Sequence, residues 1–297
     1  MKKIFLILLV LATTLTHAQI YVRAGGGYAF PMATQAIGES NHSGYIIESE
    51  TATAVPSTSE RVKGSYGAGV NFGVGGGYRF GKYFGVDLDI RHLSGNSIKT
   101  EDAQTEYSSK NVINIRRVQA TTYRSSALLI TPSFVLTAGT GNKIPYARFG
   151  VVIGSPKVKQ EYTDWSYSGN DLSKPYNKNG SSKGEYSGPS FGFQSAIGMT
   201  WALNDSFDLF TELNFTSMTW YPKTFKLTEV INTEGDNVIN QISVAGKQTE
   251  YKKKIEVTNE PDQNKPTQTL RESKPFSSLS IQVGVSYLIG GRKLMED

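Results

Sequence analysis

The chain has 297 residues, no cysteine and a formal net charge of +5 at pH 7, and it is rich in glycine, tyrosine and phenylalanine. The lack of cysteine excludes disulfides, thiol chemistry, cysteine-bound metals and acylation as a lipoprotein. The positive charge is small and dispersed along the chain, which argues against a nucleic-acid partner.

The first segment, 1–18, has the three parts of a secretory signal peptide. Two lysines follow the initial methionine, residues 4–12 form an apolar core, and the tripeptide THA at 16–18 is a small-x-small cleavage site. The apolar core has only about half of the roughly 20 residues that a membrane-spanning helix needs. We therefore predict export of the chain, with cleavage leaving Gln19 as the first mature residue.

The clearest structural pattern lies at 66–91, where two runs of alternating residues meet at a tight turn over 81–83. A period of two places successive side chains on opposite faces of a strand, so each run has one apolar face and one face of glycine and charge. The pattern predicts a hairpin. A soluble protein would bury the apolar face, whereas a transmembrane barrel turns it toward lipid and lines its lumen with the polar face.

The same alternation recurs along the whole mature chain. In chain order, the segments are 20–30, the two runs of 66–91, 126–138, 144–154, 189–204, 206–220 and 276–289. The pattern predicts an all-β fold, an antiparallel transmembrane up-and-down β-barrel of eight strands over 19–297.

The connections between these segments alternate in length. Those at 81–83, 140–143 and 204–206 are tight turns, whereas those at about 31–63, 95–123, 155–187 and 222–274 are far longer than the usual 2 to 5 residues of a hairpin. This alternation predicts short periplasmic turns, long extracellular loops and both termini in the periplasm. The last loop contains strand-like pieces at 227–231, 238–244 and 255–257, which leaves a ten-stranded barrel as an alternative.

Four motifs carry a resemblance to a known family: GGGYAF at 25–30, GGGYRF at 75–80, FGVDLDIR at 84–91 and IQVGVSYLIG at 281–290. With these strands the sequence resembles the eight-stranded outer-membrane barrels of the OmpA/OmpX-like family, within the porin-family outer-membrane β-barrel proteins. The resemblance implies a monomer in the outer membrane of a Gram-negative bacterium, in contact with membrane lipid and inserted by the barrel insertion machinery. Family members often end on an aromatic residue, whereas here Tyr287 is followed by further residues.

Charged residues on the polar parity are predicted to meet inside the lumen. They are Arg23, Arg79, Arg91, Arg148, Asp87, Asp89, Asp208 and Glu212. Eight strands leave a lumen that side chains can fill, so these groups are predicted to neutralise one another in an interior ion network. An ion path through the lumen is the functional alternative. A glycosidase-like carboxylate pair of Asp87 and Asp89 is disfavoured, because the lumen has no room for a sugar.

Aromatic residues on the apolar parity are predicted to form two girdles at the membrane interfaces. They are Phe80, Phe84, Phe149, Trp201, Phe207 and Tyr287 near the turns, and Phe30, Phe191, Phe193 and Phe215 toward the long loops.

The loops remain as the candidate functional surface. Tyr162, Trp165, Tyr167 and Tyr176 lie in the third one, and such side chains give a large rigid contact area at low entropy cost. We predict a non-enzymatic structural and surface-interaction role, with a protein or glycan as the partner. A narrow channel for small solutes is the first alternative.

An outer-membrane hydrolase of lipid or peptide is the second alternative, with His42 or His92 as the base. Neither an HExxH zinc pair nor a phosphate-binding loop is present. We therefore expect no catalytic residues, no metal and no cofactor, and no nucleic-acid partner.

Overall fold

The computed structural model describes residues 18–32, 35–48, 51–107, 113–139, 141–168, 175, 177–255 and 262–292. The predicted signal peptide, apart from the backbone of Ala18, lies outside these ranges, as does Tyr176. No helix in the described ranges is long and apolar enough to cross a membrane.

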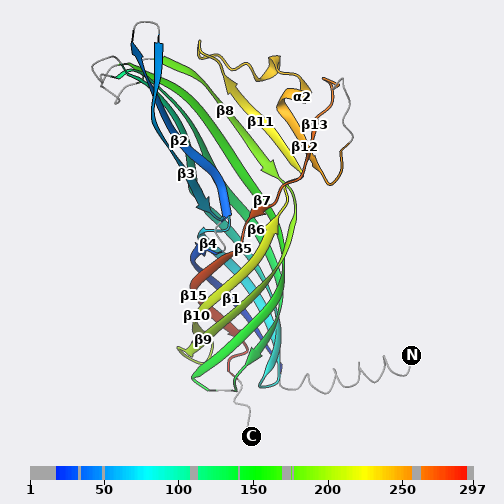
Figure 1. The fold of residues 1–297 in the computed structure, drawn as a ribbon. Coiled ribbons are helices and arrows are strands. Elements are labelled where there is room, and N and C mark those ends of the chain that lie inside the picture. Colours follow the sequence, from blue (N-terminus) through cyan, green and yellow to red (C-terminus); the bar gives the residue numbers. More distant parts are fainter. Residues whose placement is uncertain are drawn as a thin grey trace.

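Eight strands pair into a closed ring (Figure 1). Their order around the ring is β1 (Ala18–Pro31), β4 (Gly69–Phe80), β5 (Phe84–Tyr107), β6 (Ile113–Thr137), β7 (Lys143–Ser168), β9 (Ser190–Ala202), β10 (Phe207–Trp220) and β15 (Ser278–Ile289). Every neighbouring pair is antiparallel, and β1 closes the ring by pairing with β15. The predicted fold class is confirmed, and closure gives each ring strand a hydrogen-bonding neighbour on both sides, as a bilayer demands.

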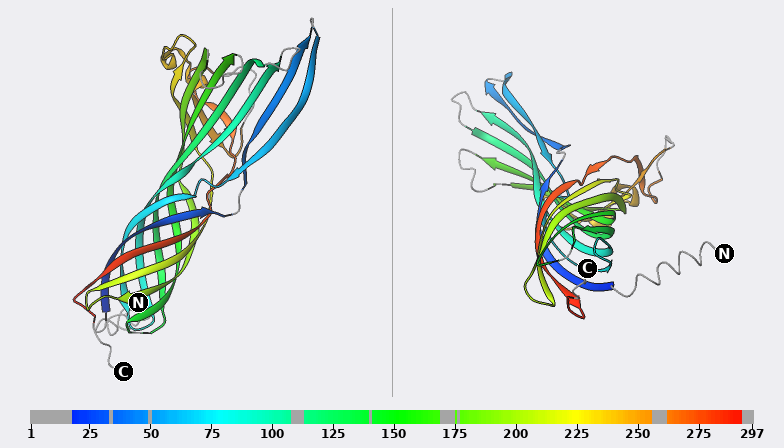
Figure 2. Two further views of the ribbon diagram at one scale, coloured as in Figure 1. Left: turned by 90° about the vertical axis from the view of Figure 1, so that its left-hand side faces the viewer. Right: turned by 90° about the horizontal axis from the view of Figure 1, so that it is seen from below.

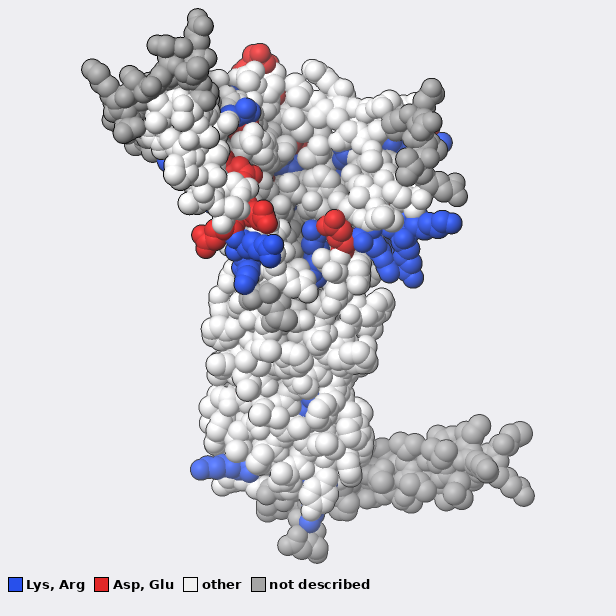
Figure 3. Space-filling view, viewed as in Figure 1, with Lys and Arg blue, Asp and Glu red and all other residues white. Residues whose placement is uncertain are grey.

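The outer wall of the ring is apolar and its inner wall is polar. Val70, Phe72 and Val74 on β4 are between 56% and 59% exposed, while the intervening Asn71 is 3% exposed. Figure 3 shows the viewed face of the barrel almost free of charged side chains between its two ends. A soluble protein has its apolar side chains inside and its polar ones outside, and the ring has the reverse arrangement, as expected of a wall that contacts lipid.

Three ring strands continue far beyond the ring and form an open sheet with the remaining strands (Figure 2). We call this sheet the crown. It consists of β2 (Gln35–Glu48), β3 (Thr51–Gly64), β8 (Asn177–Ser187), β11 (Thr224–Ile231), β12 (Gln248–Lys252) and β13 (Thr267–Leu270), together with 97–107 of β5, 113–124 of β6 and 157–168 of β7. Its order is β3-β2-β5-β6-β7-β8-β11-β12-β13, and two of these pairings, β2 with β5 and β12 with β13, are parallel. Three short elements lie nearby: η2 (Ile239–Gln241), α2 (Val244–Lys247), and β14 (Lys274–Pro275), which pairs with the end of β10.

The crown differs from the long loops that the sequence predicts. The ranges 31–63, 95–123, 155–187 and 222–274 hold strands over much of their length. These strands are rich in Ser, Thr, Asn and Lys, so they lack the apolar alternation that lipid imposes on the ring. Each is held instead by hydrogen bonds to its neighbours, which local sequence does not reveal. The ten-stranded alternative is not observed, because 227–231 lies within β11 in the crown and not in the ring.

Candidate functional site: a sealed lumen beneath an open crown

Six charged side chains form one ion cluster inside the ring. The ring places Arg23 on β1, Asp87, Asp89 and Arg91 on β5, Arg148 on β7 and Glu212 on β10, all with lumen-facing side chains. Arg23 lies 3.0 Å from Asp89 and 3.3 Å from Glu212, and it lies 3.7 Å from Asp87. The side chains of these four residues are at most 7% exposed.

Arg148 and Arg91 complete the cluster. Arg148 lies 3.2 Å from Asp87 and 2.9 Å from Glu212, and Arg91 lies 2.9 Å from Asp89. Three arginines therefore neutralise three carboxylates. Removing such charges from water is costly, and the multiple short contacts offset that cost.

Two tyrosines extend the cluster, and each lies over a glycine. Tyr21 donates a hydrogen bond to Asp87 (3.2 Å), and Tyr146 donates one to Glu212 (3.0 Å). A Cβ at Gly77 would lie 2.4 Å from the Tyr21 ring, and a Cβ at Gly198 would lie 2.5 Å from the Tyr146 ring. The inward-facing glycines thus make the space in which the rings lie flat against the wall.

The remaining two predicted members of the network lie apart from this cluster. Asp208 accepts a hydrogen bond from Arg292, which follows the last ring strand. The Arg79 guanidinium stacks over the Tyr21 ring, 5.1 Å from its centroid. Sequence reasoning missed Arg292 because it lies beyond the alternating pattern of the last strand.

An apolar cap closes the lumen on the crown side. Its members are Tyr66, Leu93, Met218, Trp220 and Phe276, all at most 3% exposed. Trp220 packs edge-on against Phe276 and donates its indole N–H to the carbonyl of Gly188 (3.0 Å). The buried indole N–H therefore has the partner that its burial requires.

Two small cavities lie within the lumen. One cavity, between the ion cluster and the cap, is lined by Asn71, Asp89 and Phe276, and another, toward the turns, is lined by Tyr21 and Arg79. Each has a volume of about 20 Å³. A cavity needs about 10 to 15 Å³ to hold one water molecule, so these spaces suit single waters and not a solute.

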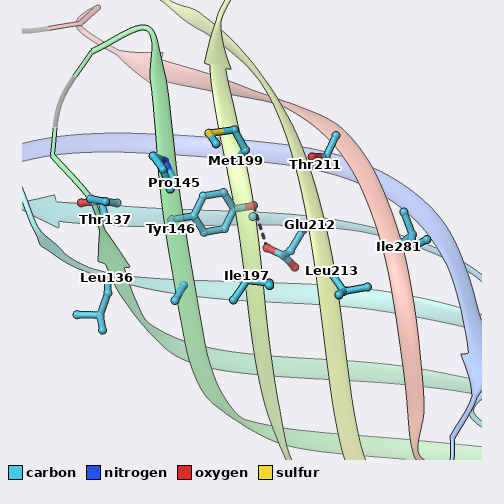
Figure 4. Close-up of a pocket in the computed structure, with 13 residues that line it drawn as sticks. Leu136, Thr137, Pro145, Tyr146, Ile197, Met199, Thr211, Glu212, Leu213 and Ile281 are labelled. Atoms are coloured by element: carbon cyan, nitrogen blue, oxygen red, sulfur yellow. Dashed lines mark hydrogen bonds between the residues drawn. The ribbon is translucent and has the colours of Figure 1, made fainter.

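A depression much larger than either of these cavities lies on the outer wall (Figure 4). It has a volume of about 790 Å³, and Leu136, Ile197, Leu213 and Ile281 project around it. Its lining is mostly apolar and faces the side of the ring that contacts lipid. Its shape and chemistry suit an acyl chain of the surrounding membrane.

A buried carboxylate ties three strands of the crown together. Asp164 of β7 is 5% exposed and accepts hydrogen bonds from Arg117 (3.0 Å) and Gln119 (3.0 Å) of β6 and from Asn179 (2.9 Å) of β8. The pairing of β7 with β8 shifts register next to Asp164, and the irregularity brings the Asn179 amide toward it. Burial alone would raise the pKa of Asp164, but the hydrogen bonds from Arg117, Asn179 and Gln119 lower this pKa to about 2.

The crown presents two different faces. The inner face continues the lumen-facing side of the ring, and it carries Tyr162, whose hydroxyl lies 3.4 Å from Asp164. Trp165 and Tyr167 have the opposite parity on β7 and lie on the outer face, where Lys178 stands 5.5 Å from the Trp165 ring centroid. Of the predicted aromatic contacts in the described ranges, Tyr162 therefore lies on one face and Trp165 and Tyr167 lie on the other.

A second aromatic group was missed by the sequence reading. Tyr186, Phe225 and Tyr251 pack side by side on β8, β11 and β12, with ring centroids 4.5 Å and 6.2 Å apart. Tyr186 also donates a hydrogen bond to Gln160 (2.9 Å), and burial raises the pKa of the Tyr186 hydroxyl well above its usual range. The alternation around Phe225 was the available signal, but the strand pairing that unites the three rings is not local.

His42 and His92 take separate positions. His92 packs against Phe72 on the outer wall, with ring centroids 5.3 Å apart, and His42 Nε2 lies 3.9 Å from a carboxylate oxygen of Glu101 in the crown. Within the part of the chain that the structure describes, no group of three or more His, Asp or Glu side chains is arranged to hold a metal ion.

Eight of the ten predicted girdle residues project from the outer wall. Phe30, Phe84, Phe149, Phe191, Phe193, Phe207, Phe215 and Tyr287 are at least 37% exposed, whereas Phe80 and Trp201 are half-buried. At the turn end, Phe207 and Tyr287 contact each other with centroids 5.1 Å apart. Their exposure on the apolar wall is the arrangement that interfacial aromatic residues require.

The closed ring, the apolar outer wall and the charged, filled interior define a transmembrane β-barrel of the outer-membrane type. The sequence matches no protein-family profile. It also matches no curated protein.

Three solved structures are similar to the chain in overall outline. The first is the outer-membrane protein OprG from Pseudomonas aeruginosa, with 11% identity and a TM-score of 0.34 over 91% of this chain and 95% of that chain. The second is Ail, the attachment invasion locus protein of Yersinia pestis, in complex with the heparin analogue sucrose octasulfate, with 8% identity and a TM-score of 0.27 over 91% of this chain and 97% of that chain. The third is the outer-membrane protease OmpT from Escherichia coli, with 8% identity and a TM-score of 0.23 over 91% of this chain and 95% of that chain. OprG and OmpT are outer-membrane proteins.

Proposed function

We propose that the chain is a non-enzymatic outer-membrane protein of a Gram-negative bacterium whose crown binds a protein or a glycan at the cell surface. In this proposal the predicted signal peptide directs export, the barrel insertion machinery places the ring in the membrane as a monomer, and the crown faces the outside. The OmpA/OmpX-like resemblance of the ring strands agrees with such a role.

The single observation that supports the proposal is that the described residues beyond the ring form, for the most part, one continuous sheet. Nine strands form the crown, and the buried Asp164 links the middle ones. An ordered surface loses little conformational entropy when it binds a partner, whereas a set of flexible loops would lose much. The crown is therefore preorganised for binding, whereas loops that only cover the barrel would not need such order.

The sealed lumen disfavours the channel alternative. The ion cluster and the apolar cap leave two cavities of about 20 Å³ each, which suit single water molecules and are too small for an organic solute. Conductance through the ring would require both the ion cluster and the apolar cap to move. The crown is therefore the better candidate for the functional surface.

The test compares the full-length protein with a trimmed barrel on intact cells at matched surface levels. In the trimmed barrel, tight turns replace the crown while the five cap residues remain. We expect it to insert and to keep heat-modifiable migration on gels, but to lose binding in glycan-array and cell-surface protein pull-down assays. If the trimmed barrel retains every binding activity of the parent, the proposal is wrong.

Two substitutions on one strand identify the face that binds. Tyr162→Ala alters the inner face and Trp165→Ala the outer face, and each is the control for the other. The variant that lowers affinity by about tenfold or more marks a contact residue, the size expected for a buried aromatic anchor. If both variants keep the affinity of the parent, the contact surface is expected at the group formed by Tyr186, Phe225 and Tyr251.

A further inference from the structure

A notch between the crown and the outer wall collects positively charged side chains. It has a volume of about 660 Å³ and lies where β12 and the segment after β13 meet the start of β9 and the end of β10. Figure 3 shows Lys and Arg gathered on the underside of the crown, directly above the uncharged wall. The charged side chains that line the notch are Lys223, Lys252, Lys253, Arg271 and Glu250.

Most of this positive charge is unneutralised. Lys252 pairs with Glu250 at 3.3 Å. Lys223, Lys253 and Arg271 are exposed and have no carboxylate within ion-pair distance in the described ranges. Four cations and one carboxylate leave a formal excess of +3 in a single notch. Such an excess attracts an anion with more than one negative charge.

The cations are carried by ordered backbone. The Lys223 N–H donates to the Ser187 carbonyl (2.8 Å), and the Lys223 carbonyl accepts from Tyr251 (2.8 Å). The Arg271 N–H donates to the Lys252 carbonyl (3.0 Å). These bonds fix the spacing of the ends of β11, β12 and β13, at or next to which the four cations lie, so the charge cluster belongs to the fold.

The other half of the notch is apolar. Phe191, 66% exposed, and Tyr221, 41% exposed, line it, and the Arg271 guanidinium stacks 4.8 Å from the Tyr221 ring centroid. Phe193, 70% exposed, continues the apolar surface down the wall. A molecule that satisfies both halves has an anionic head at the level of the crown and an apolar tail along the barrel.

We propose that the notch binds the phosphorylated headgroup of a membrane lipid in the leaflet on the crown side, with an acyl chain lying along Phe191 and Phe193. A phosphate monoester carries about −1.5 to −2 charges at pH 7 and suits an excess of +3 better than the single charge of a phosphodiester. The proposal requires an inserted barrel, but it does not depend on any ligand of the crown. The two ideas therefore succeed or fail separately.

The experiment titrates lipids against the full-length protein and reads binding by native mass spectrometry. The probes are diphosphorylated lipid A, its dephosphorylated form and phosphatidylglycerol, with inorganic phosphate as a soluble competitor. The test variant is Lys223→Gln, Lys253→Gln and Arg271→Gln combined. The matched control is Lys178→Gln, Lys247→Gln and Lys265→Gln, which removes the same charge from one crown residue and two residues beside the crown, none of which lines the notch.

The parent and the control variant are expected to prefer diphosphorylated lipid A over its dephosphorylated form. Each cation near a charged membrane surface contributes about a fivefold change in affinity, so the test variant should bind roughly 100-fold more weakly. Heat-modifiable migration reports whether each variant has folded. If the triple variant fails to fold, Lys253→Gln alone should weaken binding by about fivefold.

Several outcomes would overturn the proposal. Equal affinity for lipid A with and without phosphate would show that the acyl chains alone are bound. Equal losses in the test and control variants would assign the effect to overall charge. Phosphatidylglycerol binding as tightly as lipid A would remove the preference for a monoester, and full displacement by millimolar inorganic phosphate would make the notch an ion site and not a lipid site.

Discussion

Replacing Arg23 by leucine tests whether the interior cluster is a buried structural core. Arg23 contacts three carboxylates, on Asp87, Asp89 and Glu212, at 3.0 to 3.7 Å. In its absence each carboxylate keeps one arginine, because Arg148 still pairs with Asp87 and Glu212 and Arg91 still pairs with Asp89. The cluster is then left with one uncompensated negative charge in a lumen sealed from bulk water.

The expected cost is set by burial. Removing one partner from a buried ion pair typically destabilises a protein by about 3 to 5 kcal/mol. We expect Arg23→Leu to lower the free energy of unfolding by about this amount, measured by urea titration of the protein in lipid vesicles. Combining it with Glu212→Gln restores charge balance, so the double variant should recover at least half of the loss.

Arg79→Leu is the matched comparison, because Arg79 stacks over Tyr21 and lies outside the cluster. A cation–π contact of this kind is worth about 0.5 to 2 kcal/mol, so this variant should be the milder one. A cost below about 0.5 kcal/mol for Arg23→Leu would show that water screens the cluster. Ion flux of the Arg23→Leu variant through planar bilayers, without loss of stability, would favour the channel alternative over a structural cluster.

Three further predictions concern other parts of the chain. The pKa of Asp164 is lowered to about 2, so its ionised form stabilises the crown at any pH above the ordinary aspartate pKa. This contribution, about 1 to 2 kcal/mol, is lost as pH falls from about 4 to 2. Hydrogen exchange of β6, β7 and β8 should therefore rise between about pH 4 and pH 2, and Asp164→Asn should abolish this pH dependence. Gly198→Val should force the Tyr146 ring away from Glu212 and cost about 1 to 3 kcal/mol or more, read by unfolding in vesicles. Gly81→Ala should cost about 1 to 2 kcal/mol through backbone strain alone, because Gly81 has a φ of +86°, and it should preserve the Tyr146 contact. Intact-mass analysis of the outer-membrane fraction should find Gln19 at the N-terminus, and retention of Met1 there would contradict the predicted cleavage.

The ring could be predicted from sequence because lipid imposes a strong local contrast. Along β5, for example, Val86, Leu88 and Ile90 face out while Asp87 and Asp89 face in, and this contrast is visible residue by residue. The inward direction of six cluster members followed from the same parity. Their grouping into one cluster also follows, since a narrow lumen brings inward side chains together.

The crown could not be predicted in the same way because it has no lipid-facing side. The inner-face residues that hold Asp164 come from β6 and β8, and the Asp164–Gln119 contact spans 45 positions in sequence. Which side chains meet depends on strand register, and no apolar pattern fixes that register in these polar strands. The contact between Asp208 and Arg292 was missed for a different reason, because Arg292 lies beyond the alternating pattern of the last ring strand.

The apolar cap at the junction of ring and crown holds the two parts of the molecule together. The most deeply buried large side chains, Trp220 and Phe276, lie at this level, and the cap that they form seals the lumen below. Ile37 and Tyr186 of the crown pack against the same cap from above. Dense packing makes such a contact rigid, so the crown holds a fixed orientation relative to the membrane. A partner on the crown and a lipid in the notch would therefore both bind to one rigid unit, and neither would require the side chains in the lumen to move.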